Sequence, residues 1–214
     1  MHLARVLRAA PGMRYEVIAG PAVWLGEIVN ASEAEVRFRL LEEVPAERAL
    51  PLTLLLAVFK FDRLEWAIEK TTELGVARIV PVLARRTEKH LAQAAAARVA
   101  RWRRIAEEAA RQSRRAEVPV VEDPHALVDA LRLCEGGARL LLDENERERA
   151  LADALTECGS GPAAVAIGPE GGWSDAERRV FHEGGWMGVS LGPRILRAET
   201  AAMAAAALAG ALLG

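Results

Sequence analysis

Residues 163–175 read Ala-Ala-Val-Ala-Ile-Gly-Pro-Glu-Gly-Gly-Trp-Ser-Asp, and this stretch decides the fold class of the 214-residue chain. Five consecutive apolar residues, Ala163–Ile167, predict a strand that is covered on both faces. A glycine-rich turn follows, and Ser174 and Glu177 then have the spacing of a capping box that opens a helix. A buried strand, a glycine turn and a capped helix in succession are typical of an α/β protein with a parallel sheet.

Other apolar runs of similar length lie on either side of this stretch and alternate with helix signals. The further candidate strands are Leu52–Val58, Arg78–Val82, Val118–Val121, Arg139–Leu142 and Val189–Leu191. After the first of them, Asp62 and Glu65 are spaced as a second capping box, and Gly75 stands where that helix would end. The pattern predicts a mostly parallel sheet of about six strands with helices on both faces.

Three loops after these strands are the expected places for a ligand, because parallel sheets bind ligands outside the carboxyl ends of their strands. They follow Leu142, Ile167 and Leu191. The glycines of residues 168–172 let the backbone approach a ligand closely, and they lie beside a helix N-terminus that can receive an anion. The turn has neither the Lys-Ser/Thr of a Walker loop nor a GxGxxG pattern. A plain structural turn is the alternative interpretation.

The loop after Leu191 carries charged residues in an unusual place. Residues 191–200 read Leu-Gly-Pro-Arg-Ile-Leu-Arg-Ala-Glu-Thr. Arg194, Arg197 and Glu199 thus follow a buried strand and precede an apolar helix, so a core role does not explain them. In the simpler interpretation, the negative charge of Glu199 favours the helix N-terminus and both arginines are solvated. Two such loops in one sheet are more informative than either loop alone.

The first 48 residues predict a small β domain, with residues 45–51 as the linker to an α/β domain over 49–214. Its short β-rich runs are Arg14–Ala19, Trp24–Asn30 and Glu35–Leu41. Gly20-Pro21 marks a turn between the first two of these runs. The apolar content of this part is modest, so its core needs the rest of the chain or a partner for completion.

Composition excludes several classes of protein. Hydrophobic residues make up 51% of the chain and charged residues 27%, as in ordinary globular domains, which excludes a disordered tail. The 28 basic and 30 acidic residues nearly cancel, so any nucleic-acid site must be local. Two distant cysteines and four scattered histidines suggest no metal site. The apolar C-terminus, residues 200–213, is shorter than the ~20 residues of a membrane span. We expect a reduced cytoplasmic protein without a membrane partner.

Two basic clusters are candidate RNA contacts. Residues 85–117 contain ten Lys/Arg and four Glu, and no acidic residue precedes Glu16. Such patches attract phosphate. The candidate arginines are Arg5, Arg8, Arg14, Arg111, Arg114 and Arg115. In the alternative interpretation, the second cluster is the solvated face of an amphipathic helix whose buried stripe includes Val99 and Trp102.

The motifs together resemble a known family. IGPEGGWSDAE at residues 167–177 and LGPRILRAETA at residues 191–201 are similar to the two C-terminal motifs of the 16S ribosomal RNA uridine-N3 methyltransferases, which belong to the SPOUT class of knotted methyltransferases. The segments 60–76 and 101–113 resemble upstream segments of that family, and residues 2–8 resemble its N-terminal RNA-binding segment. The resemblance covers nearly the whole chain, although Arg114-Arg115 stands where the family commonly has Gly-Arg.

The resemblance implies an N-terminal PUA-like β-barrel for RNA binding and a C-terminal domain with a trefoil knot that binds S-adenosylmethionine. It implies a homodimer that acts on 16S ribosomal RNA or the small ribosomal subunit. The implied cofactor contacts are Leu142, Asp143, Ile167, Gly168, Pro169, Glu170, Gly171, Leu191, Gly192 and Leu196. Arg197 or Arg194 would hold the charge that develops on the uracil oxygens, and Glu199 would accept the N3 proton.

Three other functions stay open at this point. A related SPOUT enzyme that modifies another RNA position would share both C-terminal loops. A non-catalytic RNA-binding factor of ribosome assembly would keep the fold, although the intact Gly168, Gly192, Arg197 and Glu199 argue against it. A nucleotide phosphate-binding enzyme would bind ATP more tightly than S-adenosylhomocysteine.

Overall fold

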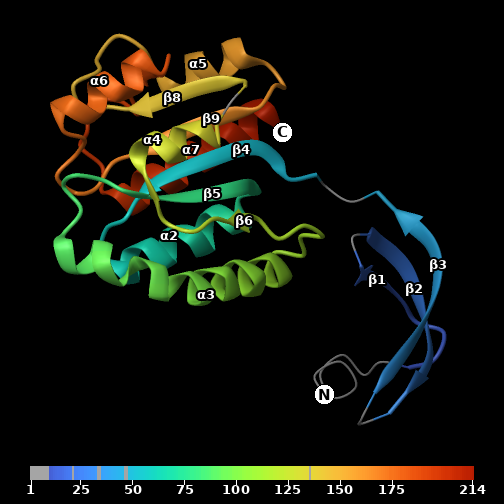
Figure 1. Cartoon of the computed structure of the whole chain (residues 1–214). Coiled ribbons are helices and arrows are strands. Elements are labelled where there is room, and N and C mark those ends of the chain that lie inside the picture. The colour runs from blue at the N-terminus through green and yellow to red at the C-terminus, as the bar shows by residue number, and fades with distance from the viewer. Residues whose placement is uncertain (1–9, 21, 33–34, 46–47, 135) are drawn as a thin grey trace. The chain divides into compact units, whose positions relative to one another are not determined.

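The computed structural model of the chain describes residues 10–20, 22–32, 35–45, 48–134 and 136–214. It divides into two compact units, Met1–Arg48 with Arg115–Glu117, and Ala49–Arg114 with Val118–Gly214. Each unit is considered by itself (Figure 1).

The first unit contains a three-stranded antiparallel sheet in the order β1-β2-β3. Its strands are β1 (Arg14–Ala19), β2 (Ala22–Ala31) and β3 (Val36–Val44), which confirms the three predicted runs and lengthens the last two. The register of β2 against β3 shifts between Leu25 and Gly26. A Cβ at Gly26 would lie 2.9 Å from the Val17 side chain. Among the described residues of this unit, Ile28 is the only large apolar side chain that is buried, which confirms the modest core.

The second unit is built on a seven-stranded sheet that is entirely parallel, in the order β10-β8-β9-β4-β5-β6, with β7 also paired to β5. The strands are β4 (Leu50–Ala57), β5 (Val76–Leu83), β6 (Val120–Val121), β7 (His125–Ala126), β8 (Ala138–Leu142), β9 (Ala163–Ile167) and β10 (Met187–Val189). Each predicted run contains a strand, but the extents differ, most of all at three places. β4 begins at Leu50, inside the expected linker, and β6 covers only the last two residues of the run Val118–Val121. β10 begins at Met187 and shares only Val189 with the predicted run, because Ser190 leaves the sheet to bridge Ala150.

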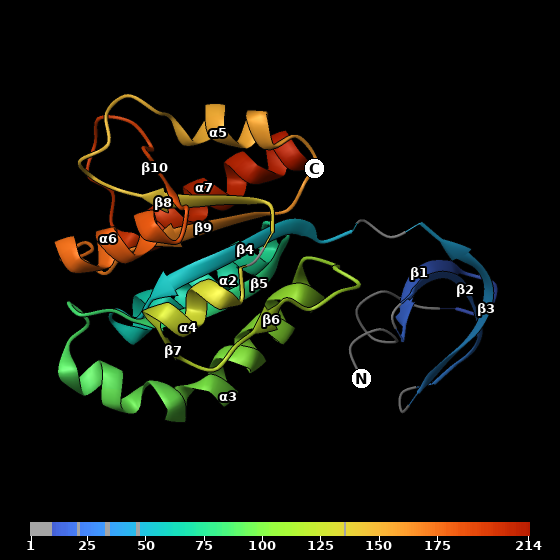
Figure 2. The ribbon, with the colours of Figure 1, turned by 45° about the horizontal axis from the view of Figure 1, so that its top comes forward.

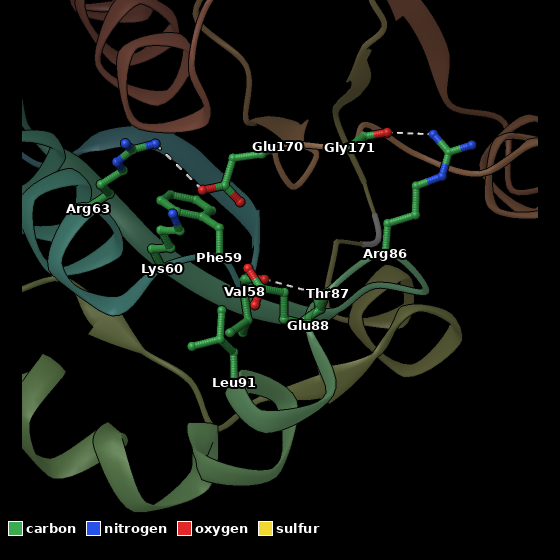
Figure 3. A pocket seen from close by; sticks show the side chains of 10 residues that line it. All are labelled: Val58, Phe59, Lys60, Arg63, Arg86, Thr87, Glu88, Leu91, Glu170 and Gly171. Carbon is green, nitrogen blue, oxygen red and sulfur yellow. Dashed lines mark hydrogen bonds and ion pairs between the residues drawn. The ribbon is translucent and has the colours of Figure 1, made fainter.

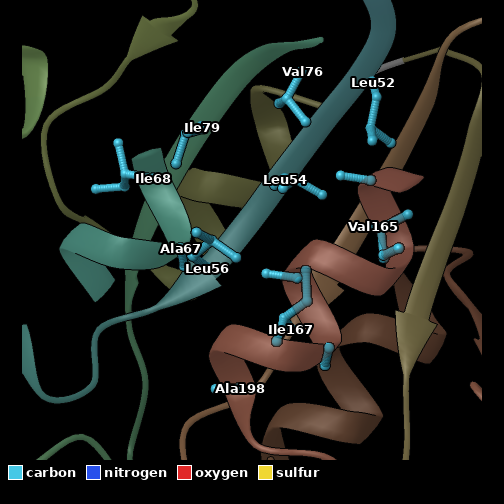
Figure 4. Packing of buried hydrophobic residues seen from close by; sticks show 14 of the residues in the cluster. Leu52, Leu54, Leu56, Ala67, Ile68, Val76, Ile79, Val165, Ile167 and Ala198 are labelled. Atoms are coloured by element: carbon cyan, nitrogen blue, oxygen red, sulfur yellow. The ribbon is translucent and has the colours of Figure 1, made fainter. Parts of the chain in front are cut away.

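Six helices cover this sheet on both faces, as expected (Figure 1, Figure 2). They are α2 (Phe61–Glu73), α3 (Lys89–Gln112), α4 (Leu127–Arg132), α5 (Leu151–Cys158), α6 (Asp175–Glu183) and α7 (Ala198–Leu213). Leu52, Leu54 and Leu56 of β4 point to one face, where they pack against α2, α3, α5 and α7 (Figure 4). Leu55 and Ala57 point to the other face, which α4 and α6 cover. The alternation of side chains along a strand produces these two layers.

One of the two expected capping boxes is present. Ser174 caps α6, and its hydroxyl and the Glu177 carboxylate bond reciprocally to backbone amides. The prediction of a capping box at Asp62 and Glu65 is wrong. α2 already begins at Phe61, and the side chain of its N-cap residue makes no capping hydrogen bond. Glu65 instead accepts a 2.8 Å hydrogen bond from Nε of Arg101 on α3.

The C-terminal segment forms α7, whose alanine-rich face is buried in the core as expected. In the described part of the chain, no helix has the length and apolarity that a membrane span requires. Among the same residues, no group of three or more His, Cys, Asp or Glu has an arrangement suited to a metal ion. Cys134 and Cys158 are both free thiols.

Candidate functional site at the switch point of the sheet

The topology of the second unit creates a crevice between β4 and β9. These strands are adjacent and parallel, yet the chain leaves β4 for α2 on one face of the sheet and leaves β9 for α6 on the other. Such a reversal separates the loops at the carboxyl ends of the two strands, and α/β proteins bind ligands at this point. The fold therefore locates a candidate site without reference to individual side chains.

A pocket of about 290 Å³ opens at this place (Figure 3). It is formed by the ends of β4 and β5, the beginnings of α2 and α3, and the glycine turn after β9. The residues that line it are Val58, Phe59, Lys60, Arg63, Arg86, Thr87, Glu88, Leu91, Glu170 and Gly171. Two of them, Glu170 and Gly171, belong to the predicted cofactor loop. The site thus includes part of the sequence prediction and adds residues that the sequence did not indicate.

Three polar interactions connect the walls of the pocket (Figure 3). Nη1 of Arg63 lies 3.6 Å from Oε1 of Glu170, and the Arg86 guanidinium donates to the carbonyl of Gly171. The Thr87 hydroxyl donates a 2.8 Å hydrogen bond to the carbonyl of Val58. The loops after β4, β5 and β9 are therefore held to one another around the opening.

The loop after β8 is attached to the glycine turn through α6. Arg178 of α6 donates a 2.9 Å hydrogen bond from Nε to Asp143 and a 2.8 Å hydrogen bond from Nη2 to Glu144. Gly172 has a φ of 68°, and a Cβ there would lie 2.6 Å from Oε1 of Glu144. The positive φ favours glycine at this position, and a larger residue would also displace the Glu144 carboxylate. Asp143, a predicted cofactor contact, has one carboxylate oxygen committed to Arg178.

The start of the third predicted loop, the one after β10, is hydrogen-bonded to both ends of the loop that follows β8. The amide of Asp143 donates to Val189, the amide of Ser190 donates to Arg149, and the amide of Leu151 donates to Ser190, at 3.1, 2.8 and 2.9 Å. Leu142, Leu191 and Leu196 are half-buried and pack against one hydrophobic cluster. The structure therefore brings together the three loops that the sequence singled out.

Within these loops, the predicted cofactor residues differ in accessibility. Ile167 and Pro169 are buried, so their side chains offer no contact surface. Gly168 lies against Trp173, whose Nε1 would be 3.2 Å from a Cβ at Gly168. Trp173 itself is fully buried, and its Nε1 has no hydrogen-bond partner. Gly192 is exposed, has a φ of 105° and has nothing within 4 Å of its Cβ position.

The three predicted catalytic residues lie at the start of α7 in different environments. The side chain of Glu199 is only 4% exposed, and its Oε1 lies 3.8 Å from Nε of Arg63. Its Oε2 has no hydrogen-bond partner among the residues that the structure describes. Arg197 is the exposed N-cap residue of α7, and Arg194 is exposed in the loop before it. In the described part of the chain neither arginine side chain makes a hydrogen bond or ion pair, so both guanidinium groups are available.

Sequence reasoning missed Arg63, which contacts both Glu170 and Glu199. It is the third residue of α2, one helix turn from the carboxyl end of β4. Arg63 falls inside the segment that carried the family resemblance, but its spacing within α2 gave no sign of carboxylates more than a hundred residues away. Lys60, Arg86 and Thr87 were missed for the same reason.

The predicted RNA-binding arginines are less uniform than their sequence clusters suggest. Arg5 and Arg8 lie outside the described residues. Arg14 is paired with Glu27 and Arg111 with Glu107, each at 3.6 Å. Arg114 is exposed with a φ of 60°. Arg115 is half-buried, and burial lowers the pKa of its guanidinium.

Most other arginines of α3 have carboxylate partners as well. Arg98 and Arg101 pair with Glu65, while Arg103 and Arg104 pair with Asp123 and Glu108. Val99 and Trp102 form the buried stripe. These pairs favour the interpretation of α3 as a helix with a solvated charged face.

Comparison with known proteins agrees with the fold and the gathered loops. Residues 46–210 match the family model described as RNA methyltransferase domain, which defines the class of the protein. The chain is 36% identical to ribosomal RNA small subunit methyltransferase E of Synechocystis sp. over 99% of its own length and 70% of that protein. It is 34% identical to the protein of the same name from Bacillus subtilis, over 82% of this chain and 72% of the relative. The chain belongs to the ribosomal RNA small subunit methyltransferase E family.

A solved structure supports the same assignment. The chain is similar to the crystal structure of ribosomal RNA small subunit methyltransferase E from Neisseria gonorrhoeae bound to S-adenosyl methionine. The TM-score is 0.79 at 31% identity, and the match covers 96% of this chain and 86% of the other.

Proposed function

We propose that this protein transfers a methyl group from S-adenosylmethionine to N3 of one uridine in 16S ribosomal RNA. The observation that carries the proposal is the 36% identity to a ribosomal RNA small subunit methyltransferase E over 99% of the chain. The convergence of the loops after β8, β9 and β10 at one edge of the sheet supports it, because both motifs of the resemblance lie in these loops.

The three loops are suited to hold the cofactor mainly through backbone groups. The open space at Gly192 and the half-buried side chains of Leu142, Leu191 and Leu196 provide a partly apolar surface for it. Gly168 belongs to the same site, where the neighbouring indole nitrogen of Trp173 lacks a partner. When bound, S-adenosylmethionine supplies an electrophilic methyl group on a sulfonium.

The residues around Glu199 then prepare the acceptor base. Uracil N3 carries a proton and is a poor nucleophile until that proton leaves, so a general base is needed. Oε2 of Glu199 is a free acceptor in a buried position and takes this proton. The lone pair left on N3 would then form the new N–C bond while the methyl–sulfur bond of the donor breaks, its electron pair stays on sulfur, and S-adenosylhomocysteine leaves. Arg197, with Arg194 beside it, stabilises the negative charge that spreads to the uracil oxygens.

The proposal also covers the architecture of the whole chain, namely a knot in the second unit and an RNA-binding barrel in the first. β10 is the edge strand of the sheet, whereas α7 packs against β4 and β9 in its middle. Since Val189 and Ser190 bond to both ends of loop 143–150, we propose that the following segment threads this loop and forms a trefoil knot. The β1–β3 sheet would belong to a PUA-like RNA-binding barrel in a domain over residues 1–48, with the methyltransferase domain over 49–214.

The active form in this proposal is a cytoplasmic homodimer. Ile195, in the loop that precedes α7, is a large aliphatic side chain that is 86% exposed. A second subunit that covers this loop would remove Ile195 from water. Light scattering after gel filtration measures the mass directly, and an Ile195→Asp variant would shift it toward that of one chain.

The test of the function is the position of the methyl group. Small ribosomal subunits and free 16S ribosomal RNA from cells that lack the gene are incubated with the protein and S-adenosylmethionine, and the nucleosides are identified by mass spectrometry. We expect N3-methyluridine at one site. A methyl group on another base or atom would replace the proposed target, and no transfer to either substrate would refute the activity.

A further inference from the structure

We propose that the pocket between the ends of β4, β5 and β9 receives the target nucleotide after it leaves the RNA helix. Lys60 holds a phosphate of this nucleotide, and the apolar floor lies under the base. The inference rests on the proposed function and adds a substrate-binding site to it. The sequence analysis predicted RNA contacts only at arginines that do not line this pocket.

The charges of the pocket favour an anion at Lys60. Three cations line the opening, but Arg63 is already paired with Glu170 and Glu199. Glu88 lies 3.6 Å from a ring nitrogen of His90. Lys60 is exposed, and its ammonium group makes no hydrogen bond or ion pair with any residue that the structure describes. Its ammonium group is therefore available to a ligand.

Arg86 adds a second positive charge. Its guanidinium donates to the carbonyl of Gly171, and a carbonyl does not neutralise the charge. Phosphate oxygens of RNA match both cations, and contacts of this kind supply most of the binding free energy of nucleic acids to proteins.

The floor and the size of the pocket suit one nucleotide. Val58, Phe59 and Leu91 close the bottom of the pocket, and each is at most 6% exposed, so a base would meet them over a small apolar area. The volume of about 290 Å³ is near the lower end of the range of small-molecule sites, so a single nucleotide fits better than a stretch of strand. N3 of a paired uracil is hidden inside the base pair, so the base must be unpaired or extruded for the reaction.

Arg63 connects the pocket with the catalytic carboxylate. It lines the pocket and also contacts Glu199, the proposed base. Glu170 and Gly171 belong both to the pocket wall and to the glycine turn of the cofactor loop. A base held in this pocket would therefore lie next to the groups that remove its proton and next to the methyl donor.

An anion at Lys60 has two possible sources, the RNA phosphate and the carboxylate of S-adenosylmethionine, and the experiment separates them. Lys60→Ala removes an exposed side chain that makes no hydrogen bond or ion pair with a described residue, so we expect the variant to fold normally. Arg179→Ala is the matched control, since Arg179 is an exposed cation of α6 whose side chain makes no hydrogen bond or ion pair with a described residue. For each protein, KM for 16S ribosomal RNA is measured over a range of salt, and the affinity for S-adenosylmethionine is measured by calorimetry.

For Lys60→Ala we expect KM for RNA to rise about tenfold and the slope of log KM against log salt to fall by about one, as for one lost phosphate contact. Affinity for S-adenosylmethionine should stay unchanged, and Lys60→Arg should restore most of the loss. An unchanged KM and slope, or a loss confined to cofactor affinity, would overturn the inference. Because the wild-type protein is assayed first, its failure to methylate RNA would refute the proposed function instead.

Discussion

Nε of Arg63 lies 3.8 Å from Oε1 of Glu199, and this contact joins the first turn of α2 to the first turn of α7. The Glu199 side chain is almost completely buried, while that of Arg63 is 29% exposed. Burial of a charged carboxylate is unfavourable unless the charge is compensated. The nearby guanidinium of Arg63 and the positive end of the α7 dipole both compensate the charge of Glu199. Because Arg63 also contacts Glu170, it holds the glycine turn and α7 in one arrangement.

Arg63→Met should destabilise the fold by leaving the buried carboxylate of Glu199 without its cation. Removing one partner of a buried pair costs several kcal/mol, and the partial exposure of Arg63 reduces this to about 1–3 kcal/mol. Glu199→Gln in the same chain should recover most of the loss, because no buried charge remains. Urea unfolding of the two single variants and the double variant measures the coupling. Strict additivity of the two changes would show that the residues do not interact.

Arg197→Ala should lower kcat by about 10²–10³ and change the affinity for S-adenosylmethionine only a few-fold. The exposed guanidinium is available for the charge that develops on the uracil oxygens, and one such donor has an effect of this size. Arg194→Ala serves as the comparison; if Arg194 binds RNA phosphate, its loss raises KM for RNA and leaves kcat unchanged. Single-turnover methyl transfer separates the two. Undiminished turnover of the Arg197 variant would remove this residue from the mechanism.

Gly192→Val should lower the affinity for S-adenosylmethionine at least tenfold. Nothing lies within 4 Å of the Cβ position at Gly192, so the new side chain would occupy the open space of the loop. Its φ of 105° adds strain of about 1–3 kcal/mol, which thermal unfolding will report. Gly168→Ala is the contrasting variant, because its Cβ would meet the buried Trp173 at 3.2 Å and act mainly on stability. Normal cofactor affinity of a folded Gly192→Val protein would exclude this loop from the site.

The sequence predicted the parallel sheet because each of its longer strands is a near-continuous apolar run, as is typical of strands buried on both faces. Ser174 and Glu177 also predicted the start of α6 correctly, since a capping box is a local interaction. The same spacing at Asp62 and Glu65 predicted a capping box that does not form. Glu65 instead bonds to Arg101, a residue distant in the sequence. β7 was missed because His125–Ala126 has no apolar run around it, and α4 was missed because its six residues are too few to show a helical period.

The site could be predicted only as a set of loops. The rule for parallel sheets located the ends of β8, β9 and β10, and the structure brings those loops together. The pocket required the strand order, which places β9 beside β4 although about a hundred residues separate them. No local pattern contains that information. The contacts of Arg63 with Glu170 and Glu199 were therefore beyond sequence reasoning, although each residue was visible in a motif.

Glu177→Ala should be among the more destabilising single changes in α6. Oε2 of Glu177 accepts from the amide and hydroxyl of Ser174, and Oε1 accepts a 2.7 Å hydrogen bond from the amide of Arg85. The side chain thus connects the loop after β5 with the start of α6, and it is buried. We expect a loss of about 2–4 kcal/mol in urea unfolding, against about 1 kcal/mol for Ser174→Ala, which removes the cap alone. Equal losses would show that the bond to Arg85 contributes nothing.

Cys134 should make the stability of the protein depend on alkaline pH. Burial raises the pKa of its thiol from an ordinary value of 9.0 to about 11, and the nearby Arg78 and Arg139 offset this only in part. The folded state therefore keeps a proton that the unfolded state releases. The stabilisation that this thiol contributes is complete below pH 9.0 and is lost as the pH rises to about 11.

Urea unfolding from about pH 8 to 11 measures this loss of stability, and Cys134→Ala should reduce it. Thiol reactivity gives an independent test with an internal control. Near pH 8 about one thousandth of the Cys134 side chains would be thiolate, whereas the half-buried Cys158 is more accessible. Titration of the native protein with a disulfide reagent should therefore label Cys158 first and Cys134 only after unfolding. Equal labelling rates for both cysteines would contradict the burial of Cys134 and, with it, the expected alkaline transition.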